Sequence, residues 1–313
     1  MTLSKRRLVI IHNPTSGMRN KNRFSKALLC LADTDCEVEI LKTKGPGHAT
    51  DMTRELVARN DPDIVLVAAG GDGTVSEILN GLEGGELPLG VIPLGTANVL
   101  ARELGVGASI DRAIEILIAA VPVPVYSAKA NEKRFLLMAG AGYDSLTVAA
   151  LRPGEKKRFG AIAYMFAAFR AASGFRDMEL EVTVNGKRHT AASAVIAKAR
   201  YYGGPFVIAS EGGIEKPRFD VVLLKNAGFV AAFRYGMALL FNRLSRLSDV
   251  QTLITDEEIL INSSRIFPCQ CDGDICLETP LRISLDPAPI MILRAPGNQS
   301  TAHTAGPETH TAR

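Results

Sequence analysis

The chain has few cysteines, little net charge and no long apolar run. Its five cysteines are an odd number in 313 residues, which argues against a secreted disulfide framework and favours reduced thiols. A formal net charge of +3 creates no strong general field for nucleic acid, and we expect no such partner. Hydrophobic residues still make up 47% of the chain, so we expect two domains with proper cores rather than a disordered protein.

No stretch is long enough to cross a bilayer as an apolar helix. Residues 8–11 are apolar and follow a basic N-terminus, but they are too few for the core of a signal peptide. Residues 297–313 are rich in Gly, Ser, Thr, His and Pro, which is typical of a disordered tail. Cys269, Cys271 and Cys276 lie close in sequence but lack the regular spacing of zinc ligands. We therefore expect a cytoplasmic protein, with peripheral contact to the inner face of the membrane left open.

Strands and helices alternate in the first part of the chain. The predicted strands are 8–11, 37–41, 64–69 and 89–92, and the predicted helices are 23–31, 49–59, 74–82, 97–104 and 110–120. This alternation predicts an α/β domain with a doubly wound parallel sheet over residues 1–125. Ligands bind such sheets at the carboxyl ends of the strands, so the turns that follow the strands are the candidate site.

Short alternating strands dominate from about residue 126. Asn185-Gly186 stands between two alternating runs, which is a strong hairpin signal. Further strands are predicted at 194–199, 220–224, 258–262 and 282–285, and helices at 159–172 and 229–244. We expect a mainly antiparallel, β-rich second domain over residues 126–296, and leave open whether its final strand returns to the first domain.

The most informative motif follows the apolar strand at 64–69. Gly70, Gly71 and Gly73 can take φ > 0 and have no Cβ, so backbone N–H groups can press against a ligand. A strand, a glycine turn and a helix N-terminus together form an anion site. Asp72 would repel phosphate there unless a cation is present. The predicted ligand is therefore a nucleotide that carries Mg²⁺, with Asp72 contacting the metal directly or through water.

Three more turns follow predicted strands. Asn13–Gly17 offers side chains that can donate to phosphate, although such a loop is common by itself. In Pro93–Asn98, Thr96 could cap the following helix or contact phosphate. The turn that begins at Thr43 is an ordinary Gly/Pro exit from a strand when taken alone.

The turns at 13–17, 70–74 and 93–98, in this order, resemble the catalytic domain of the diacylglycerol kinase family, which includes sphingosine and ceramide kinases. The Gly-Gly-Asp-Gly-Thr turn alone also occurs in NAD kinases and 6-phosphofructokinases, so the resemblance depends on all three turns and covers residues 8–296. It implies ATP in a cleft between an α/β and a β-rich domain. The residues expected to bind nucleotide and Mg²⁺ are Asn13, Pro14, Thr15, Ser16, Gly17, Thr43, Gly70, Gly71, Asp72, Gly73, Thr74, Glu77, Gly95, Thr96 and Asn98.

The same resemblance implies a catalytic base. Asp272 matches the aspartate of an Asp-Gly-Glu pattern that accepts the proton of the lipid hydroxyl, whereas Asp274 stands where the family has glutamate. From composition alone, Asp272-Gly273 is better interpreted as a hairpin turn. The chain departs from the family at Glu215–Arg218, where an Asp-Asp-Gly can hold a structural Mg²⁺, and we expect that metal site to be absent or altered.

Two segments combine basic and apolar residues. Residues 152–158 lead into the apolar helix predicted at 159–172, and residues 229–247 contain Arg234, Arg243 and Arg246 among Phe, Met and Leu. Such segments suit transient contact with an anionic membrane surface, but a helix packed on the β-rich domain reads in the same way. A homodimer is left open.

The sequence thus predicts an ATP- and Mg²⁺-dependent lipid kinase of phospholipid biosynthesis, with Asp272 and Asp72 as catalytic residues. The leading reaction is diacylglycerol to phosphatidic acid. The alternatives are a kinase for a sphingoid base, ceramide or phosphatidylglycerol, and a nucleotide-binding regulator without catalysis.

Overall fold

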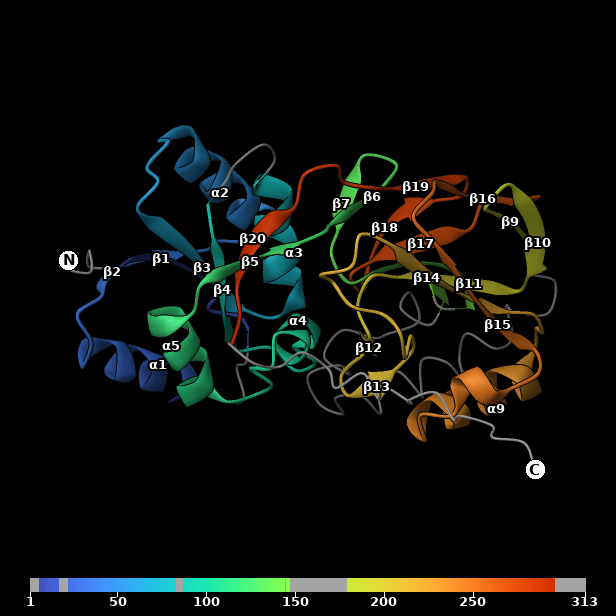
Figure 1. The fold of residues 1–313 in the computed structure, drawn as a ribbon, viewed down its shortest axis with the longest axis horizontal. Helices are drawn as coiled ribbons and strands as arrows, with labels where there is room; N and C mark the ends of the chain where they lie inside the picture. The colour runs from blue at the N-terminus through green and yellow to red at the C-terminus, as the bar shows by residue number, and fades with distance from the viewer. Residues whose placement is uncertain (1–5, 17–21, 83–86, 144, 147–178, 296–313) are drawn as a thin grey trace, which may run out of the picture.

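The computed structural model describes residues 6–16, 22–82, 87–143, 145–146 and 179–295. Figure 1 shows an α/β part on the left and a β-rich part on the right. Gly17, residues 152–158, the helix predicted at 159–172 and the tail at 297–313 lie outside the described residues. No helix among the described residues is both long enough and apolar enough to cross a membrane.

The α/β part is built on a six-stranded sheet in the order β2-β1-β3-β4-β20-β5. All its strands are parallel to their neighbours except β5, which pairs antiparallel with β20. Every residue of β3 is buried, as its continuous apolar run predicts. The strands are β1 (Arg7–His12), β2 (Glu37–Lys42), β3 (Ile64–Gly70), β4 (Leu89–Pro93), β5 (Pro122–Val125) and β20 (Ile290–Leu293).

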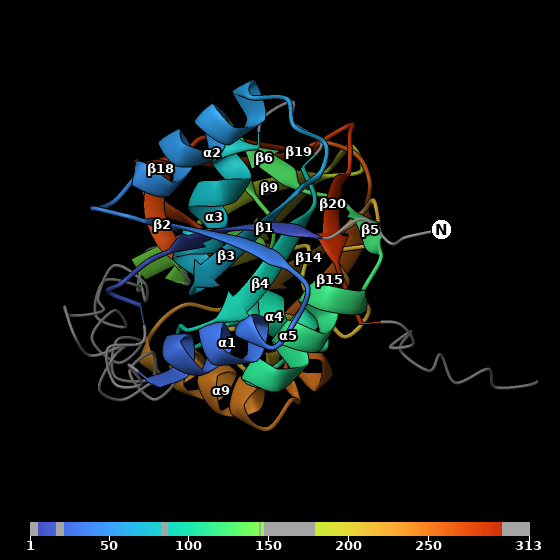
Figure 2. The same ribbon diagram turned by 90° about the vertical axis from the view of Figure 1, so that its left-hand side faces the viewer.

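Helices cover both faces of this sheet, which confirms the doubly wound fold. In Figure 2, α2 (His48–Ala58) and α3 (Asp72–Gly81) lie above the sheet, and α1 (Asn22–Ala32), α4 (Val99–Glu103) and α5 (Ile110–Ala119) lie below it. The connection from β1 runs outward to β2, whereas the connection from β3 runs the opposite way to β4. The switch point, where doubly wound sheets bind ligands, therefore lies between β1 and β3.

Two strands of this sheet come from segments that the sequence did not predict as strands. β5 lies where the Val-Pro-Val-Pro texture indicated the end of the domain. Its two prolines are tolerated because β5 is an edge strand. β20 reaches the sheet after the whole β-rich part has been traversed, and it inserts between β4 and β5.

The β-rich part consists of two six-stranded sheets, in the orders β10-β9-β16-β19-β6-β7 and β15-β14-β11-β8-β17-β18. Side chains from both sheets, such as Val182, Ile196 and Phe219, form one buried cluster. The strands are β6 (Ala128–Ala130), β7 (Lys133–Phe135), β8 (Met138–Gly142), β9 (Leu180–Val184), β10 (Lys187–Ala191), β11 (Ser193–Ala197), β14 (Phe219–Leu224), β15 (Val250–Thr255), β16 (Ile259–Ser263), β17 (Pro268–Cys271), β18 (Asp274–Glu278) and β19 (Leu281–Leu285).

Smaller elements complete this part. The predicted Asn185-Gly186 hairpin joins β9 to β10, with both residues at positive φ. A short hairpin of β12 (Tyr201–Tyr202) and β13 (Phe206–Val207) lies toward the α/β part. Helix α9 (Phe229–Leu240) is shorter than predicted, because Asn242 turns to φ 53° and a 3₁₀ turn follows at Leu244–Arg246.

Candidate active site

The turns after β1 and β3 are held together by Asn13. Its backbone N–H donates to the carbonyl of Ala69 at 3.0 Å, and its Nδ2 donates to Oγ1 of Thr74 at 3.2 Å. Its Oδ1 accepts from both the N–H and the hydroxyl of Thr15, at 3.0 and 2.8 Å. Asn13 therefore shapes its own loop and fixes that loop against the glycine turn.

The turns after β3 and β4 touch through their backbones. The N–H groups of Leu94 and Gly95 both donate to the carbonyl of Gly70, at 2.9 and 3.2 Å. A Cβ on Gly70 would lie 2.3 Å from Oγ1 of Thr74, and one on Gly71 would lie 3.2 Å from the Cα of Gly95. None of Gly70, Gly71 and Gly73 has positive φ, so the sequence-based appeal to left-handed backbone is wrong. At Gly70 and Gly71 the requirement is space.

Asp72 is the first residue of α3 and follows the N-cap Gly71. Its Oδ1 accepts from the N–H of Leu100, at the start of α4, at 3.2 Å. The carboxylate is thus held where the helix dipole and the first N–H groups of α3 attract negative charge.

The remaining predicted nucleotide residues surround the same edge of the sheet. The N–H of Thr43 donates to the carbonyl of His12 at 2.9 Å, which places the turn after β2 beside the turn after β1. The Glu77 carboxylate accepts from the N–H of Ala49 at 3.1 Å and so engages the start of α2. Pro14, Thr15 and Ser16 form the turn after β1, and Pro14 and Thr15 are exposed.

Thr96 does not cap α4. The helix begins two residues later than predicted, at Val99, and its N-cap is Asn98 in the left-handed region at φ 46°. Nδ2 of Asn98 donates to the carbonyl of Gly95 at 2.9 Å, while its buried Oδ1 has no hydrogen-bond partner among the described residues. Thr96 is exposed in the loop between β4 and α4.

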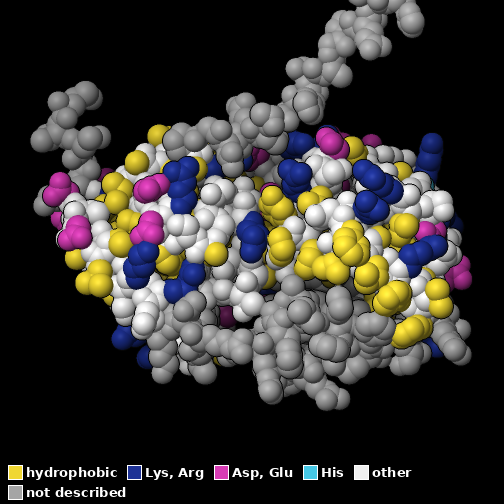
Figure 3. Space-filling model, turned by 90° about the horizontal axis from the view of Figure 1, so that it is seen from below, with side chains coloured by type: hydrophobic (Ala, Val, Ile, Leu, Met, Phe, Trp, Pro, Cys, Tyr) yellow, Lys and Arg dark blue, Asp and Glu magenta, His cyan; other side chains and the backbone are white. Residues whose placement is uncertain are grey.

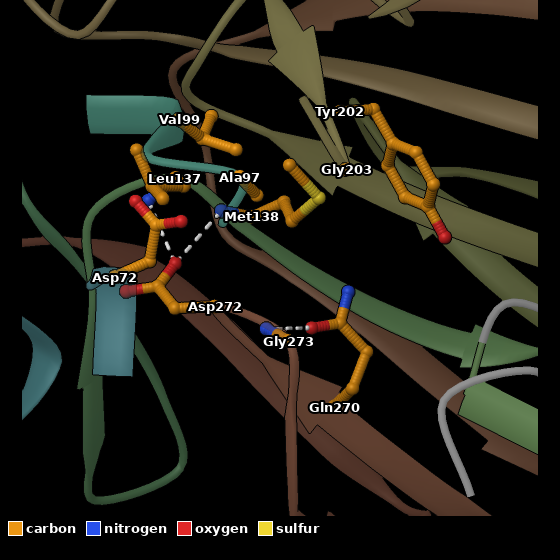
Figure 4. A pocket seen from close by; sticks show the side chains of 10 residues that line it. All are labelled: Asp72, Ala97, Val99, Leu137, Met138, Tyr202, Gly203, Gln270, Asp272 and Gly273. Atoms are coloured by element: carbon orange, nitrogen blue, oxygen red, sulfur yellow. Dashed lines mark hydrogen bonds between the residues drawn. The ribbon is translucent and has the colours of Figure 1, made fainter. Parts of the chain in front are cut away.

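A cleft of about 420 Å³, including space open to solvent, lies where the two parts meet (Figure 4). Asp72, Ala97 and Val99 line it from the α/β part. The β-rich part contributes Leu137, Met138, Tyr202, Gly203, Gln270, Asp272 and Gly273. The structure therefore brings Asp72 and Asp272 into one pocket, and Figure 4 shows their carboxyl groups close together.

Asp272 sits in the two-residue turn between β17 and β18. Asp272 and Gly273 have φ of 50° and 86°, the values of a type I′ hairpin turn, so the turn interpretation is confirmed. A role for Asp272 in the site is compatible with this turn. The carboxylate is fixed by backbone donors (Figure 4). Oδ2 accepts from the N–H of Leu136 at 3.0 Å. Oδ1 accepts from the N–H groups of Leu137 and Met138 at 2.8 and 3.1 Å, the two bonds drawn in Figure 4.

The surroundings of Asp272 raise the pKa of its carboxyl to about 6. Burial of the carboxyl among protein atoms is the main cause, and the nearby negative charge of Asp72 acts in the same direction. The three backbone N–H groups oppose this by stabilising the carboxylate. A carboxylate with such a pKa is mostly ionised at neutral pH, yet it accepts a proton more readily than an ordinary aspartate does.

Asp274 lies over the glycine turn. A Cβ built on Gly73 would stand 3.7 Å from Oδ2 of Asp274, although the two residues belong to different parts of the molecule. Asp72, Asp272 and Asp274 thus gather around the start of α3. Among the described residues no group of His, Cys, Asp and Glu side chains forms a metal site by itself.

The Glu215–Arg218 segment is held by a buried lysine. Nζ of Lys198 donates to the carbonyl of Lys216 and, at 2.9 Å, to the carbonyl of Arg218. Lys198 is 1% exposed, and burial lowers the pKa of its ammonium to about 8, with Asp220 opposing that shift. The Lys198 ammonium therefore binds carbonyls of the 215–218 segment, the position at which the family resemblance implies a structural Mg²⁺.

Several residues of the site were not predicted from the sequence. Leu136, Leu137 and Met138 act through backbone N–H groups, which side-chain patterns do not reveal. Gln270, whose Oε1 accepts from the N–H of Gly273 at 2.8 Å, stands two residues before Asp272, and proximity alone could have suggested it. Tyr202 enters the cleft from the β12–β13 hairpin.

Two protein families match the chain. Residues 7–130 match the family described as the diacylglycerol kinase catalytic domain. Residues 138–294 match the one described as the YegS C-terminal NAD kinase beta sandwich-like domain. The first match covers the α/β part as far as β5 and also includes β6, whereas the second covers most of the β-rich part together with β20.

Individual relatives agree with these matches. A diacylglycerol kinase of Bacillus subtilis is 28% identical over 276 residues, covering 86% of this chain and 90% of its own. One from Staphylococcus aureus is 33% identical over 188 residues, covering 58% of each chain. A crystal structure from Bacillus anthracis, described provisionally as a diacylglycerol kinase, superposes with a TM-score of 0.80 at 25% identity and covers 95% of this chain and 97% of its own.

Proposed function

This chain belongs to the diacylglycerol kinase catalytic-domain family, and from that membership we propose that it transfers the γ-phosphoryl group of ATP to a lipid hydroxyl. Diacylglycerol is the proposed acceptor, with phosphatidic acid as the product. The observation that carries the proposal is the meeting of Asp272 with Asp72, a residue of the glycine turn, in one cleft.

The seat for the phosphates is the edge where the turns after β1, β3 and β4 converge. Asn13 joins the first two turns, and the backbone contact of Gly71 with Gly95 joins the second to the third. The N-terminus of α3 supplies N–H groups and a positive dipole end at this edge. Because Gly71 and Gly95 have no Cβ, the turns after β3 and β4 can lie against each other at this edge.

The charges at this seat suit a Mg²⁺-bound nucleotide. Asp72, Asp272 and Asp274 would repel a bare triphosphate, and Mg²⁺ is commonly held by one or two carboxylates together with substrate phosphates. Asp72 is the residue proposed to hold the ion, directly or through water. When bound, Mg²⁺ neutralises charge that develops on the phosphates.

Asp272 is the proposed base. Its carboxylate accepts the proton of the lipid hydroxyl as that oxygen bonds to the γ-phosphorus, and the bond from the γ-phosphorus to the β–γ bridging oxygen breaks to release ADP. The three N–H groups from Leu136 to Met138 hold the carboxylate in place for this step. In this family of reactions positioning and charge supply most of the catalysis, so the seat matters as much as the base.

The test is to incubate the purified protein with Mg²⁺, γ-labelled ATP and a panel of detergent-solubilised lipids. We expect label in phosphatidic acid when diacylglycerol is present, and none with Asp72→Ala. Label only in another lipid would replace the acceptor by a sphingoid base, ceramide or phosphatidylglycerol. ATP binding without turnover on any lipid would favour a non-catalytic regulator.

A further inference from the structure

Helix α9 and the residue after it expose a broad apolar face. The exposed fractions are 55% for Phe229, 79% for Val230, 50% for Phe233, 40% for Leu240 and 63% for Phe241. At about 100° per residue, these five positions fall within an arc of about 120°. The buried residues Ala231, Ala232 and Tyr235 occupy the opposite side and attach the helix to the protein. We call the five exposed residues the α9 face.

The segment that carries the α9 face has a net positive charge. Residues 225–248 contain four basic residues and no Asp or Glu. Arg234 pairs with Asp249, while Lys225, Arg243 and Arg246 are exposed and leave the segment net positive. Figure 3 shows hydrophobic side chains gathered on the half of the molecule that carries α9, with Lys and Arg side chains nearby.

We propose that the α9 face and its basic residues dock this protein on the surface of an anionic phospholipid bilayer. An interfacial helix places apolar side chains at the boundary of headgroups and acyl chains and basic ones against the headgroups. A symmetric contact between two copies fits less well, because it would bring the same basic residues toward one another. The inference rests on the proposed function, since a kinase for a membrane lipid must meet its acceptor at a bilayer.

The α9 face is linked to the cleft by one hairpin. Oδ1 of Asn242 accepts from the N–H of Val207 in β13 at 2.9 Å. The same hairpin carries Tyr202 and Gly203, which line the cleft. Its other end is fixed to the α/β part, because Oε1 of Glu103 accepts from the N–H groups of Arg200 and Tyr201 at 2.5 and 2.8 Å. The β12–β13 hairpin therefore connects the C-terminal end of α9 to the lining of the cleft.

Binding to vesicles tests the proposal without any use of turnover. We would measure co-sedimentation of the full chain with vesicles of phosphatidylcholine alone and of phosphatidylcholine mixed with phosphatidylglycerol. We expect binding to the mixed vesicles that falls with added salt. The double variant Val230→Glu/Phe241→Glu should bind at least tenfold more weakly. Arg243→Ala/Arg246→Ala should lose about 30-fold, at about fivefold for each basic residue near an anionic surface.

Matched controls keep the result specific. Val121 is 73% exposed and lies in the α/β part, so Val121→Glu adds one negative charge at an exposure similar to that of Val230, and it should bind like the wild type. Arg59→Ala/Lys187→Ala removes two exposed basic residues elsewhere and should have little effect. Circular dichroism of each variant checks that it is folded.

The outcomes separate docking from catalysis. If docking is right, Val230→Glu/Phe241→Glu keeps the wild-type rate on a short-chain, water-soluble diacylglycerol and loses the rate on vesicles. Vesicle binding without turnover on any lipid would overturn the proposed function and leave the docking surface intact. Equal binding by the α9 variants and the wild type, or no preference for anionic vesicles, would overturn the docking surface. A dimer that these variants convert to monomers without any change in vesicle binding would assign the face to a second copy.

Discussion

Gly71 and Gly95 lie backbone against backbone, so closely that a Cβ on Gly95 would stand 2.6 Å from the Cα of Gly71 and 2.8 Å from Oδ1 of Asn98. This contact joins the turns after β3 and β4 into one surface. Neither neighbour can move away without loss, because Gly71 is the N-cap of α3 and Asn98 is the N-cap of α4.

We therefore expect Gly95→Ala to separate the two turns. It should destabilise the protein by about 1–3 kcal/mol, as overpacking typically does, and weaken ATP binding more than tenfold. Denaturant unfolding and calorimetric titration with Mg²⁺-ATP measure the two effects. Gly45→Ala is the control, since nothing lies within 4 Å of its Cβ position. Equal ATP affinity of the two variants would mean that the glycine contact does not shape the nucleotide seat.

Asp272→Asn should lower kcat about 10²–10⁴-fold, the usual contribution of a positioned base, and leave Mg²⁺-ATP binding intact. Asparagine tolerates the left-handed turn at this position, so the hairpin should persist. Its single carbonyl oxygen can still accept from Leu137 and Met138, while the N–H of Leu136 loses its acceptor. A variant that turns over at the wild-type rate would remove Asp272 as the base.

The pH profile follows from the pKa of about 6 for the Asp272 carboxyl. A base must be unprotonated to accept the hydroxyl proton, so kcat/KM should be level well above pH 6, half-maximal near pH 6, and fall about tenfold per pH unit well below it. Because the charge of Asp72 helps to raise this pKa, Asp72→Asn should shift the titration of Asp272 to lower pH. Carboxyl-labelled NMR titration follows that shift even without turnover. An acid limb that persists in Asp272→Asn would belong to another group.

Lys198 gives a test that is independent of catalysis. Lys198→Met should cost about 1–3 kcal/mol of stability, because it leaves two loop carbonyls without their donor. It also removes one of the cations that, with Arg218 and Lys216, stabilise the charged form of the buried Asp220 carboxyl. Adding Asp220→Asn should recover part of the loss. The exposed Lys187→Met should change stability by less than about 0.5 kcal/mol. Denaturant midpoints compare the variants, and a loss no larger than that of Lys187→Met would refute the role of the ammonium.

The fold could be predicted from the sequence wherever a local residue pattern determines the secondary structure. The fully apolar run of β3 and the alternation before it predicted the doubly wound sheet, and Asn185-Gly186 predicted its hairpin. Glycine clusters after parallel strands pointed to one edge because carboxyl ends share an edge, and the contact of Gly71 with Gly95 shows that they meet there.

Prediction from the sequence failed where contacts with a segment remote in the sequence determine the local structure. β5 and β20 are four-residue strands, and the prolines of β5 read as a linker until its place at the sheet edge is known. The N-cap of α4 was misplaced at Thr96, because Asn98 adopts a left-handed conformation that composition does not announce. The donors to Asp272 are backbone N–H groups of Leu136, Leu137 and Met138, which are remote in the sequence. Because backbone groups are the same in every residue type, the sequence does not reveal these donors.

The return of β20 to the first sheet has a consequence for the order in which the chain can fold. During synthesis the ribosome delivers β1 to β4 early, but the strand that lies between β4 and β5 emerges only after the β-rich part has been made. Until Ile290–Leu293 arrives, one edge of β4 stays open and β5 has no strand to pair with. The α/β part is therefore expected to reach its final form last, and a nascent chain stalled before residue 290 should hold a finished β-rich part beside an incomplete sheet.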